Sequence, residues 1–316
     1  MRTKKIGTRE LRSIILSESE KARRKKGRRT LASYLFEDAV PEKIDSDLYP
    51  NKLSNVRPDL AKELAATGQG DLDKVRAGPT SKQANKMKAS QTTMDFGKFI
   101  GMAIQMMGKL GNFSGGAGGD LGAVISNDLH IMDGHHRWAA TLMVDPTANV
   151  KGIGVDLPGE KLVGVLNVWT IAHGGKGKPS DTNLADISGD DVAQGLKKMV
   201  EEGNKWLPAS DKILEAFKSN GFDSIEAAAA HVKKNWDATS TTREIKNWMP
   251  AKIDMPAIEP DQLETVSTDI STGKMDLNPD YSPEVKQTMG NKKESRLRQD
   301  QLVMERWLKL SGLLKG

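Results

Sequence analysis

Hydrophobic side chains recur along the chain at two different spacings, and together they predict a fold that mixes helices with strands. Residues 94–110 repeat apolar side chains at three- and four-residue intervals, which is the pattern of an amphipathic helix. Two short apolar runs, at 121–126 and 129–132, are separated by two turn-forming residues and predict a β-hairpin. A helix is expected to follow the hairpin and to end before Pro146.

Later segments extend the same pattern. The apolar runs at 150–155 and 162–171 predict two further strands. Amphipathic stretches at 190–202, 210–219 and 224–236 each begin with a residue that can cap a helix, so they predict three helices. The sequence therefore predicts an α+β fold, with a small mixed sheet as its core and helices added to it.

Between and beyond these elements the pattern weakens, and the terminal arms are expected to be extended and partly irregular. Residues 39–87 contain four prolines and predict little beyond a short helix near 58–66. The expected organisation is a basic helical arm at 1–38, a linker at 39–71, a core at 72–180, a helical subdomain at 181–248, an extended linker at 249–293 and an amphipathic helix at 294–316.

Positive charge is concentrated at the N-terminus. The chain of 316 residues carries a net charge of +5, whereas residues 1–29 alone hold twelve Lys and Arg against three Glu. This arm therefore carries +9 and the rest of the chain −4. Such an arm is expected either to contact nucleic acid, DNA in particular, or to remain a solvated run that docks an acidic protein. Its candidate nucleic-acid-binding residues are Arg23, Arg24, Lys25, Lys26, Arg28 and Arg29.

The composition narrows the class of protein. The chain has no cysteine, which excludes disulfides and cysteine-ligated metals and favours an intracellular protein. Hydrophobic residues make up 37% of the chain and its mean hydropathy is −0.52, so segments beside the core are expected to be extended or to depend on partners. No apolar run is long enough to span a bilayer, and we expect a cytoplasmic protein without a membrane partner.

The strongest chemical signal is the run from Asp133 to Trp138, which reads Asp-Gly-His-His-Arg-Trp. Gly134 allows a sharp turn and a close approach to a ligand, and a helix start presents unpaired N–H groups with a partial positive charge. The run therefore predicts a phosphate-binding turn, whereas Trp138 is expected to pack in the core. Lys176 and Lys178 either approach the same phosphate or belong to a flexible glycine-rich loop, which is the default.

The side chains of this turn admit several roles. Arg137 is expected to bind two phosphate oxygens through its planar guanidinium. His135 and His136 point about 100° apart on a helix, so one is expected to contact phosphate or move a proton and the other to satisfy backbone groups. Asp133 is expected to cap the helix, the alternative being that it orients a histidine or holds Mg²⁺.

Two segments carry a resemblance to a known family. Residues 131–140, Ile-Met-Asp-Gly-His-His-Arg-Trp-Ala-Ala, resemble the signature of the ParB/sulfiredoxin superfamily in its D-G-H-H-R variant. Residues 88–92 resemble the P-(S/T)-Q segment of the same domains, with Ala89 in place of the proline. The resemblance spans roughly residues 72–172. It implies a small mixed α/β core in which the strand–turn–helix binds nucleotide phosphates.

The resemblance also implies site residues and ligands. Members of the superfamily use CTP, ATP or ADP, so a nucleotide is the expected cofactor, with Mg²⁺ as a companion of its phosphates. The implied phosphate-binding residues are Gly134, His135, His136 and Arg137, with Ser90, Gln91 and Thr92, and the catalytic candidates are His135, His136 and Asp133. The sulfiredoxin reaction is excluded, because it needs a cysteine where this chain has histidines. No zinc-ligand spacing is present, so no metal held by the protein alone is expected.

Three functions remain open on this sequence. The first is a nucleotide-dependent phosphotransferase or hydrolase. The second is a DNA-binding nuclease of the ParB-like kind, although no clear helix-turn-helix follows the core. The third is a non-catalytic structural protein, such as a phage virion component, that keeps the fold and docks a protein partner or a second copy through its terminal helices. We favour the first, in the cytoplasm, or in the host cytoplasm or virion if a phage encodes the protein.

Overall fold

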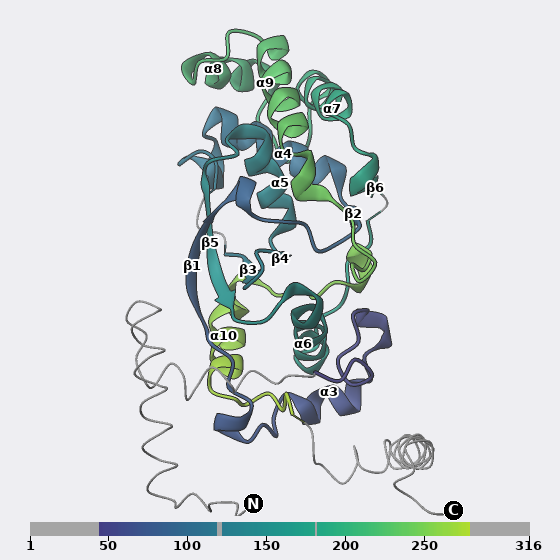
Figure 1. Ribbon diagram of the computed structural model, residues 1–316. Helices are drawn as coiled ribbons and strands as arrows, with labels where there is room; N and C mark the ends of the chain where they lie inside the picture. The colour runs from purple at the N-terminus through teal and green to yellow at the C-terminus, as the bar shows by residue number, and fades with distance from the viewer. Residues whose placement is uncertain (1–43, 119–121, 181, 279–316) are drawn as a thin grey trace, which may run out of the picture. The chain divides into compact units, whose positions relative to one another are not determined.

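The computed structural model describes residues 44–118, 122–180 and 182–278 (Figure 1). Its helices are α3 (Pro58–Leu64), α4 (Phe96–Gly108), α5 (His135–Val144), α6 (Gly159–Ala172), α7 (Gly189–Glu202), α8 (Ser210–Ser219), α9 (Ile225–Ala238) and α10 (Leu263–Ser271). Its strands are β1 (Ala77–Gln83), β2 (Thr93–Met94), β3 (Val124–Ser126), β4 (Ile131–Asp133), β5 (Asn149–Val155) and β6 (Thr182–Asn183). The predicted α+β class is confirmed.

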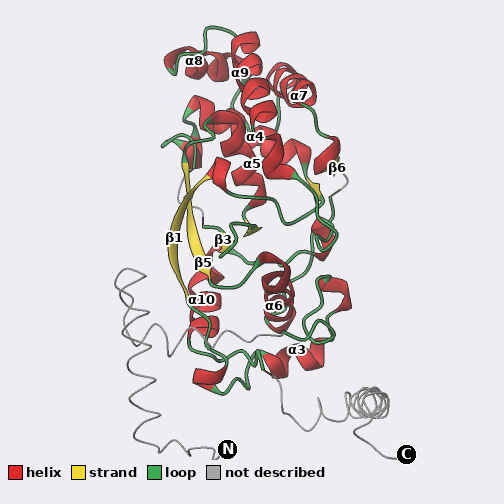
Figure 2. Ribbon diagram, in the orientation of Figure 1, coloured by secondary structure: helices red, strands yellow, loops and turns green. Residues whose placement is uncertain are grey.

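Four of these strands form one mixed sheet in the order β1-β5-β3-β4. β1 and β5 are antiparallel, β5 and β3 are parallel, and β3 and β4 form the predicted antiparallel hairpin. Figure 2 shows β1 and β5 as the long curved pair of this sheet. β2 and β6 pair separately as a two-stranded antiparallel sheet. A bridge between Lys88 and His130 joins residues 88–92 to the chain just before β4.

Alternate residues of the hairpin enter two separate hydrophobic cores. Ile125 and Ile131 pack with buried residues of α4, α5, α7, α8 and α9. Val124 and Met132 pack instead with buried residues of α3, α6 and α10. This follows from the two-residue period of a strand, which points successive side chains to opposite faces. The hairpin is thus covered by helices on both faces, as Figure 1 shows.

The prediction of a strand at residues 162–171 is wrong, because these residues lie in helix α6. Val163, Val165 and most other residues of the run are buried, so the helix lacks the polar face that would mark a 3.6-residue period. Gly164 lets another segment pass close, since a Cβ there would lie 2.1 Å from the carbonyl oxygen of Tyr49. A continuous buried run has no periodicity that separates helix from strand.

Two segments expected to be linkers fold against the core where the structure describes them. In residues 39–71, α3 packs on α6, and the hydroxyl of the buried Tyr49 donates to the carbonyl oxygen of Asp276. In residues 249–293, the segment expected to be extended contains α10 and buried side chains such as Met255. These apolar anchors have no regular spacing, so the sequence shows no pattern that would predict their burial.

The predicted basic arm and the predicted C-terminal helix lie outside the described residues. The same holds for the six candidate nucleic-acid-binding residues between positions 23 and 29, so these expectations stay predictions. Within the described ranges, no helix is both long enough and apolar enough to cross a membrane.

Candidate anion-binding site

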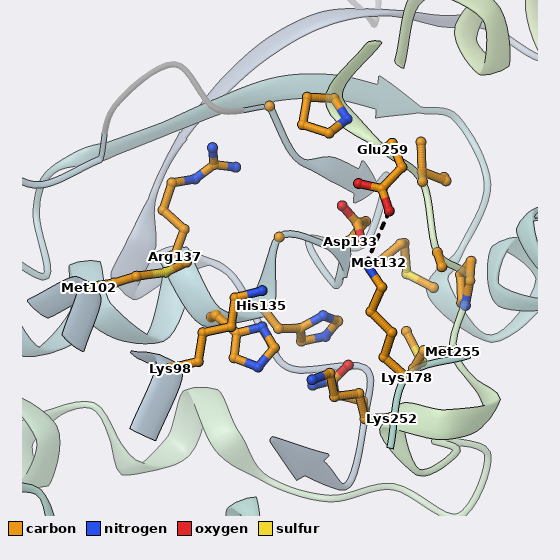
Figure 3. A pocket seen from close by; sticks show the side chains of 18 residues that line it. Lys98, Met102, Met132, Asp133, His135, Arg137, Lys178, Lys252, Met255 and Glu259 are labelled. Atoms are coloured by element: carbon orange, nitrogen blue, oxygen red, sulfur yellow. Dashed lines mark hydrogen bonds and ion pairs between the residues drawn. The ribbon is translucent and has the colours of Figure 1, made fainter. Parts of the chain in front are cut away.

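A cavity of about 250 Å³ lies at the junction between β4 and α5, where the Asp-Gly-His-His-Arg run is found (Figure 3). Its lining includes Gln91, Lys98, Met102, Gly122, Met132, Asp133, Gly134, His135, His136, Arg137, Lys178, Lys252 and Glu259. Of the eight site residues expected from the sequence, the fold brings six to this cavity, and the two exceptions are Ser90 and Thr92.

Gly134 makes the turn from β4 into α5. Its φ of 94° lies in the left-handed region that favours glycine. A Cβ at this position would lie 3.2 Å from the Cβ of Ala123 and 3.3 Å from the carbonyl oxygen of Gly122. The turn therefore suits glycine alone, and it places the start of α5, with its partial positive charge, at the cavity.

The prediction that Asp133 caps α5 is wrong. The capping position is Gly134, where no side chain accepts a hydrogen bond, and Asp133 is the last residue of β4. Its partly buried carboxyl group lines the cavity. Burial raises the pKa of Asp133 to about 6, although the neighbouring Arg137 favours the ionised form. A carboxyl group that titrates near neutral pH is suited to proton transfer.

His135 is buried and acts as a hydrogen-bond acceptor. The backbone N–H of Ser90 donates to its Nε2 at 3.3 Å. The Ser90 hydroxyl lies 3.2 Å from the same nitrogen and donates to the carbonyl oxygen of Ile131 at 2.5 Å. Burial lowers the pKa of His135 well below its usual value, and His136 acts in the same direction. The ring is therefore neutral at physiological pH, and it fastens residues 88–92 to the motif.

His136 makes a similar contact with a different element. The backbone N–H of Asp95, which precedes α4, donates to its Nε2 at 3.3 Å. Burial lowers the pKa of His136 to about 3, and the positive charges of Lys252 and Lys98 contribute. Because Nε2 accepts in both neutral rings, we assign the ring proton of each to Nδ1. The two histidines thus hold the walls of the cavity in place, and neither brings a positive charge to a phosphate.

Of the remaining residues implied by the resemblance, some line the cavity and others hold the surrounding backbone in place. Arg137 lines the cavity from α5 with only 3% of its surface exposed. Gln91 also lines it, and its side-chain amide donates to the carbonyl oxygen of Thr93 at 2.8 Å. The backbone N–H and hydroxyl of Thr92 both donate to the carbonyl oxygen of Pro250, outside the cavity lining. Thr92 therefore supports the site without facing a ligand.

Three lysines complete the cavity, and two of them carry no signal in the sequence. Lys98 comes from α4 and Lys252 from the segment after α9, while Lys178 comes from the loop expected to be flexible. Figure 3 shows Lys178 extending to Glu259, whose carboxylate oxygen lies 3.0 Å from its Nζ. Burial lowers the pKa of Lys252, with Lys98 and Lys178 acting in the same direction and Asp95 against them.

The lining of the cavity carries more positive than negative charge. Arg137 and the three lysines stand against two carboxyl groups, Asp133 and Glu259, and both histidines are neutral. Lys98 lies on the polar face of an amphipathic helix, where lysine is ordinary, and Lys252 lies in a segment without periodicity. Only the fold shows that these two residues meet the motif.

Comparisons of the chain with protein-family models, with curated proteins and with solved structures find no match. The resemblance to the ParB/sulfiredoxin superfamily therefore rests on the residues of its two motif segments. Within the part of the chain that the structure describes, no group of three or more His, Cys, Asp and Glu side chains is placed to hold a metal ion.

Replacing Asp133 with asparagine is expected to raise the melting temperature above about pH 6 and to leave it unchanged near about pH 4. The folded protein holds the Asp133 proton with a pKa of about 6, whereas an aspartate in the unfolded chain has a pKa of about 3.9. The stabilisation that Asp133 contributes is therefore complete at low pH and is lost as the pH rises through about 6, because the folded protein must then ionise a buried carboxyl group. Asparagine has no proton to lose, so the variant avoids this free-energy cost.

Thermal melts of both proteins across this pH range provide the measurement. Asp276, whose pKa burial and Asp73 also raise to about 6, contributes equally to both proteins and cancels in the difference. Asp186→Asn, at an exposed aspartate outside the cavity, is the matched control. A gain from Asp133→Asn of the same size at every pH would show that Asp133 does not titrate in this range.

Proposed function

We propose that this protein binds a nucleotide with its phosphate groups in the cavity at the start of α5, and that it transfers or hydrolyses the terminal phosphoryl group. The supporting observation is that Arg137, in the first turn of α5, and three lysines from other segments line the same cavity. Cations and a helix N-terminus together favour a phosphate. The resemblance of the motif to the ParB/sulfiredoxin superfamily supports a nucleotide as the carrier of that phosphate.

The size of the cavity suits the phosphates of a nucleotide better than the whole molecule. Pockets that bury a drug-sized ligand have volumes of about 300–1,000 Å³, and this one has about 250 Å³. Its charged residues combine the planar fork of Arg137 with the flexible ammonium groups of the lysines, which can follow several phosphate oxygens. The nucleoside would then extend beyond this cavity.

Asp133 is the residue to which we assign proton transfer. Its pKa of about 6 leaves it ionised at neutral pH, and it lines the cavity together with Arg137. In the proposed reaction, an oxygen of water or of an acceptor hydroxyl bonds to the terminal phosphorus, and the bond from that phosphorus to the bridging oxygen breaks. The attacking oxygen gives its proton to the Asp133 carboxylate. The cations stabilise the charge on the phosphate oxygens, which is the main source of catalysis in phosphoryl transfer.

A phosphate-bound Mg²⁺ fits the carboxyl groups of the site. Mg²⁺ is commonly held by one or two carboxylates together with phosphate oxygens and water. Glu259 lines the cavity and is the carboxylate that the proton transfer does not use, so it is the residue that would hold the ion. The ion would supply further neutralisation of the phosphate charge.

A nucleotide-binding protein without turnover is the second candidate, and the two histidines favour it. Both rings were catalytic candidates, and one of them was expected to contact phosphate or move a proton, yet each accepts a backbone N–H and is neutral. A module that only holds a nucleotide needs the cations but no proton acceptor. Asp133→Asn separates the two candidates, because it should abolish turnover in the first while nucleotide binding persists in both.

Replacing Lys98 or Lys252 with glutamine is expected to weaken pyrophosphate binding about tenfold in each case. A hydrogen bond to a charged group contributes about 1.5–3 kcal/mol, and about 1.4 kcal/mol corresponds to a tenfold change in Kd. Calorimetric titration with pyrophosphate, and then with ATP, ADP and CTP in the presence of Mg²⁺, measures the effect. The affinity should also fall with added salt, which screens the charge of exposed lysines such as Lys98.

Lys82→Gln is the control for this experiment. Lys82 is an exposed lysine of β1, outside the lining of the cavity, so its removal changes the net charge equally without touching the site. Equal losses in all three variants would assign the binding to overall charge. If pyrophosphate and every nucleotide fail to bind the wild-type protein, the proposed function is wrong.

A further inference from the structure

The phosphate cavity adjoins a second cavity. This second cavity has a volume of about 530 Å³. Lys98, Met102, Lys178 and Lys252 line both cavities and form the wall between them. A ligand whose charged part is held by these lysines therefore has room to continue into the second space.

The residues that line only the second cavity differ in character from those of the phosphate site. They include the aromatic Phe113 and Trp206 and the apolar Leu207. They also include three side-chain amides, those of Gln105, Asn112 and Asn204. An aromatic surface beside groups that can both donate and accept hydrogen bonds suits a flat heterocycle with polar edges.

We propose that the second cavity holds the nucleoside of the nucleotide whose phosphates occupy the first, with its base stacked on Trp206. This inference rests on the proposed function, because the phosphates are its anchor. The volumes of the two cavities agree with this placement of nucleoside and phosphates. The second cavity, at about 530 Å³, falls within the usual range for an organic ligand, whereas the phosphate cavity, at about 250 Å³, falls below it. The lysines of the shared wall then lie beside the phosphates nearest the ribose.

Trp206 has the position and the exposure that stacking on a base requires, because it lines the second cavity and its ring is accessible to a ligand. It lies in the loop between α7 and α8, and 63% of its surface is exposed. Its backbone N–H donates to Oδ1 of Asn204 at 3.1 Å, which holds the loop in shape. The ammonium of Lys205 lies 5.0 Å from the centroid of the indole and adds positive charge next to it.

The origin of this loop bears on specificity. Residues 203–209 join α7 to α8, whereas the family resemblance spans roughly residues 72–172. The motif of the phosphate site thus lies within the span of the resemblance, although Lys178 and Lys252 join that site from outside it. The proposed nucleoside site is completed by the loop between the added helices. The choice of base would therefore be a property of this chain's own helical addition.

Trp206→Ala is expected to weaken nucleotide binding about tenfold or more and to leave pyrophosphate binding unchanged, because alanine removes the stacking surface and no phosphate contact. Calorimetric titrations use pyrophosphate, ATP, CTP and GTP with the full-length protein. Trp206→Phe should restore most of the nucleotide affinity, since it keeps an aromatic face. Leu72→Ala is the matched control, as it removes another apolar side chain that is 60% exposed and lies outside both cavities.

The outcomes separate this inference from the proposed function. Selective loss of nucleotide affinity in Trp206→Ala, with rescue by Trp206→Phe, supports it. If pyrophosphate and the nucleotides bind Trp206→Ala with the same affinity as the wild type, the inference is wrong, but the proposed phosphate site is unaffected. An equal loss for pyrophosphate would also overturn it, because Trp206 would then act on the phosphate cavity. Wild-type protein that binds none of the ligands overturns both.

Discussion

Arg137→Lys is expected to weaken pyrophosphate binding by at least about tenfold while the protein stays folded. Lysine keeps the charge and most of the buried stem, but it replaces a planar fork of donors with a single ammonium group. Truncation to alanine is a poorer test, because only 3% of Arg137 is exposed and its removal would leave a cavity beside α5. Calorimetric titration with pyrophosphate and a thermal melt of the same sample provide the measurements.

Arg243→Lys is the matched control for this substitution. Arg243 is also buried, with 8% of its surface exposed, but it lies outside the lining of the cavity. Its guanidinium donates to the carbonyl oxygens of Thr239 and Trp236, so its replacement should lower the melting temperature without changing pyrophosphate affinity. Wild-type affinity in Arg137→Lys would show that the fork makes no phosphate contact, and equal losses in both variants would trace the effect to stability.

The strand–turn–helix of the site could be predicted because its signals are local. A short apolar run, a glycine and a stretch of residues compatible with a helix follow one another within residues 129–144, and each acts on its own backbone. Gly134 has the positive φ that a sharp turn requires. The helices α4, α7, α8 and α9 were predictable for a similar reason, since each keeps a polar face toward water and an apolar face toward the core.

The roles of the side chains in the turn could not be predicted, because their partners are far away in the sequence. His135 accepts from Ser90, 45 positions earlier, and His136 accepts from Asp95, 41 positions earlier. These contacts make both rings neutral acceptors of backbone N–H groups, a role that the sequence predicted for only one of them. Asp133 changes in the opposite direction, from an expected structural role to a chemical one. It was expected to cap the helix, but burial by the surrounding fold raises its pKa to about 6.

The same limit applies to the parts of the fold that depend on packing. α6 has no polar face because α3 packs on it and it also contacts β3 and β4, so an apolar run that favours a strand by composition becomes a buried helix. Lys252 lines the cavity because residues 250–260 pack beside the end of β4. No feature of the sequence predicts this packing. Chemistry carried by such segments can be found only after the chain is folded.

Trp138→Ala is expected to cause the largest loss of stability, about 3–5 kcal/mol. The side chain is fully buried, and its Nε1–H donates to the carbonyl oxygen of Ala84 at 2.9 Å, which ties α5 to the segment that leads into residues 88–92. Its ring also lies in a T-shaped arrangement with the ring of His135, with 6.4 Å between the centroids. Removing it therefore loosens the first turn of α5 as well as the core that contains α4 and α9.

Urea unfolding of Trp138→Ala, Trp138→Phe and the wild type measures this effect. Phenylalanine fills most of the space but loses the indole hydrogen bond, so its midpoint should lie between the other two. The carbonyl oxygen of Ala84 still accepts from the N–H of Met87, which limits the loss in the phenylalanine variant. Trp206→Ala serves as the control: with 63% of that side chain exposed, its stability should stay within about 0.5 kcal/mol of the wild type. Equal midpoints for the two alanine variants would show that Trp138 does not anchor the motif helix.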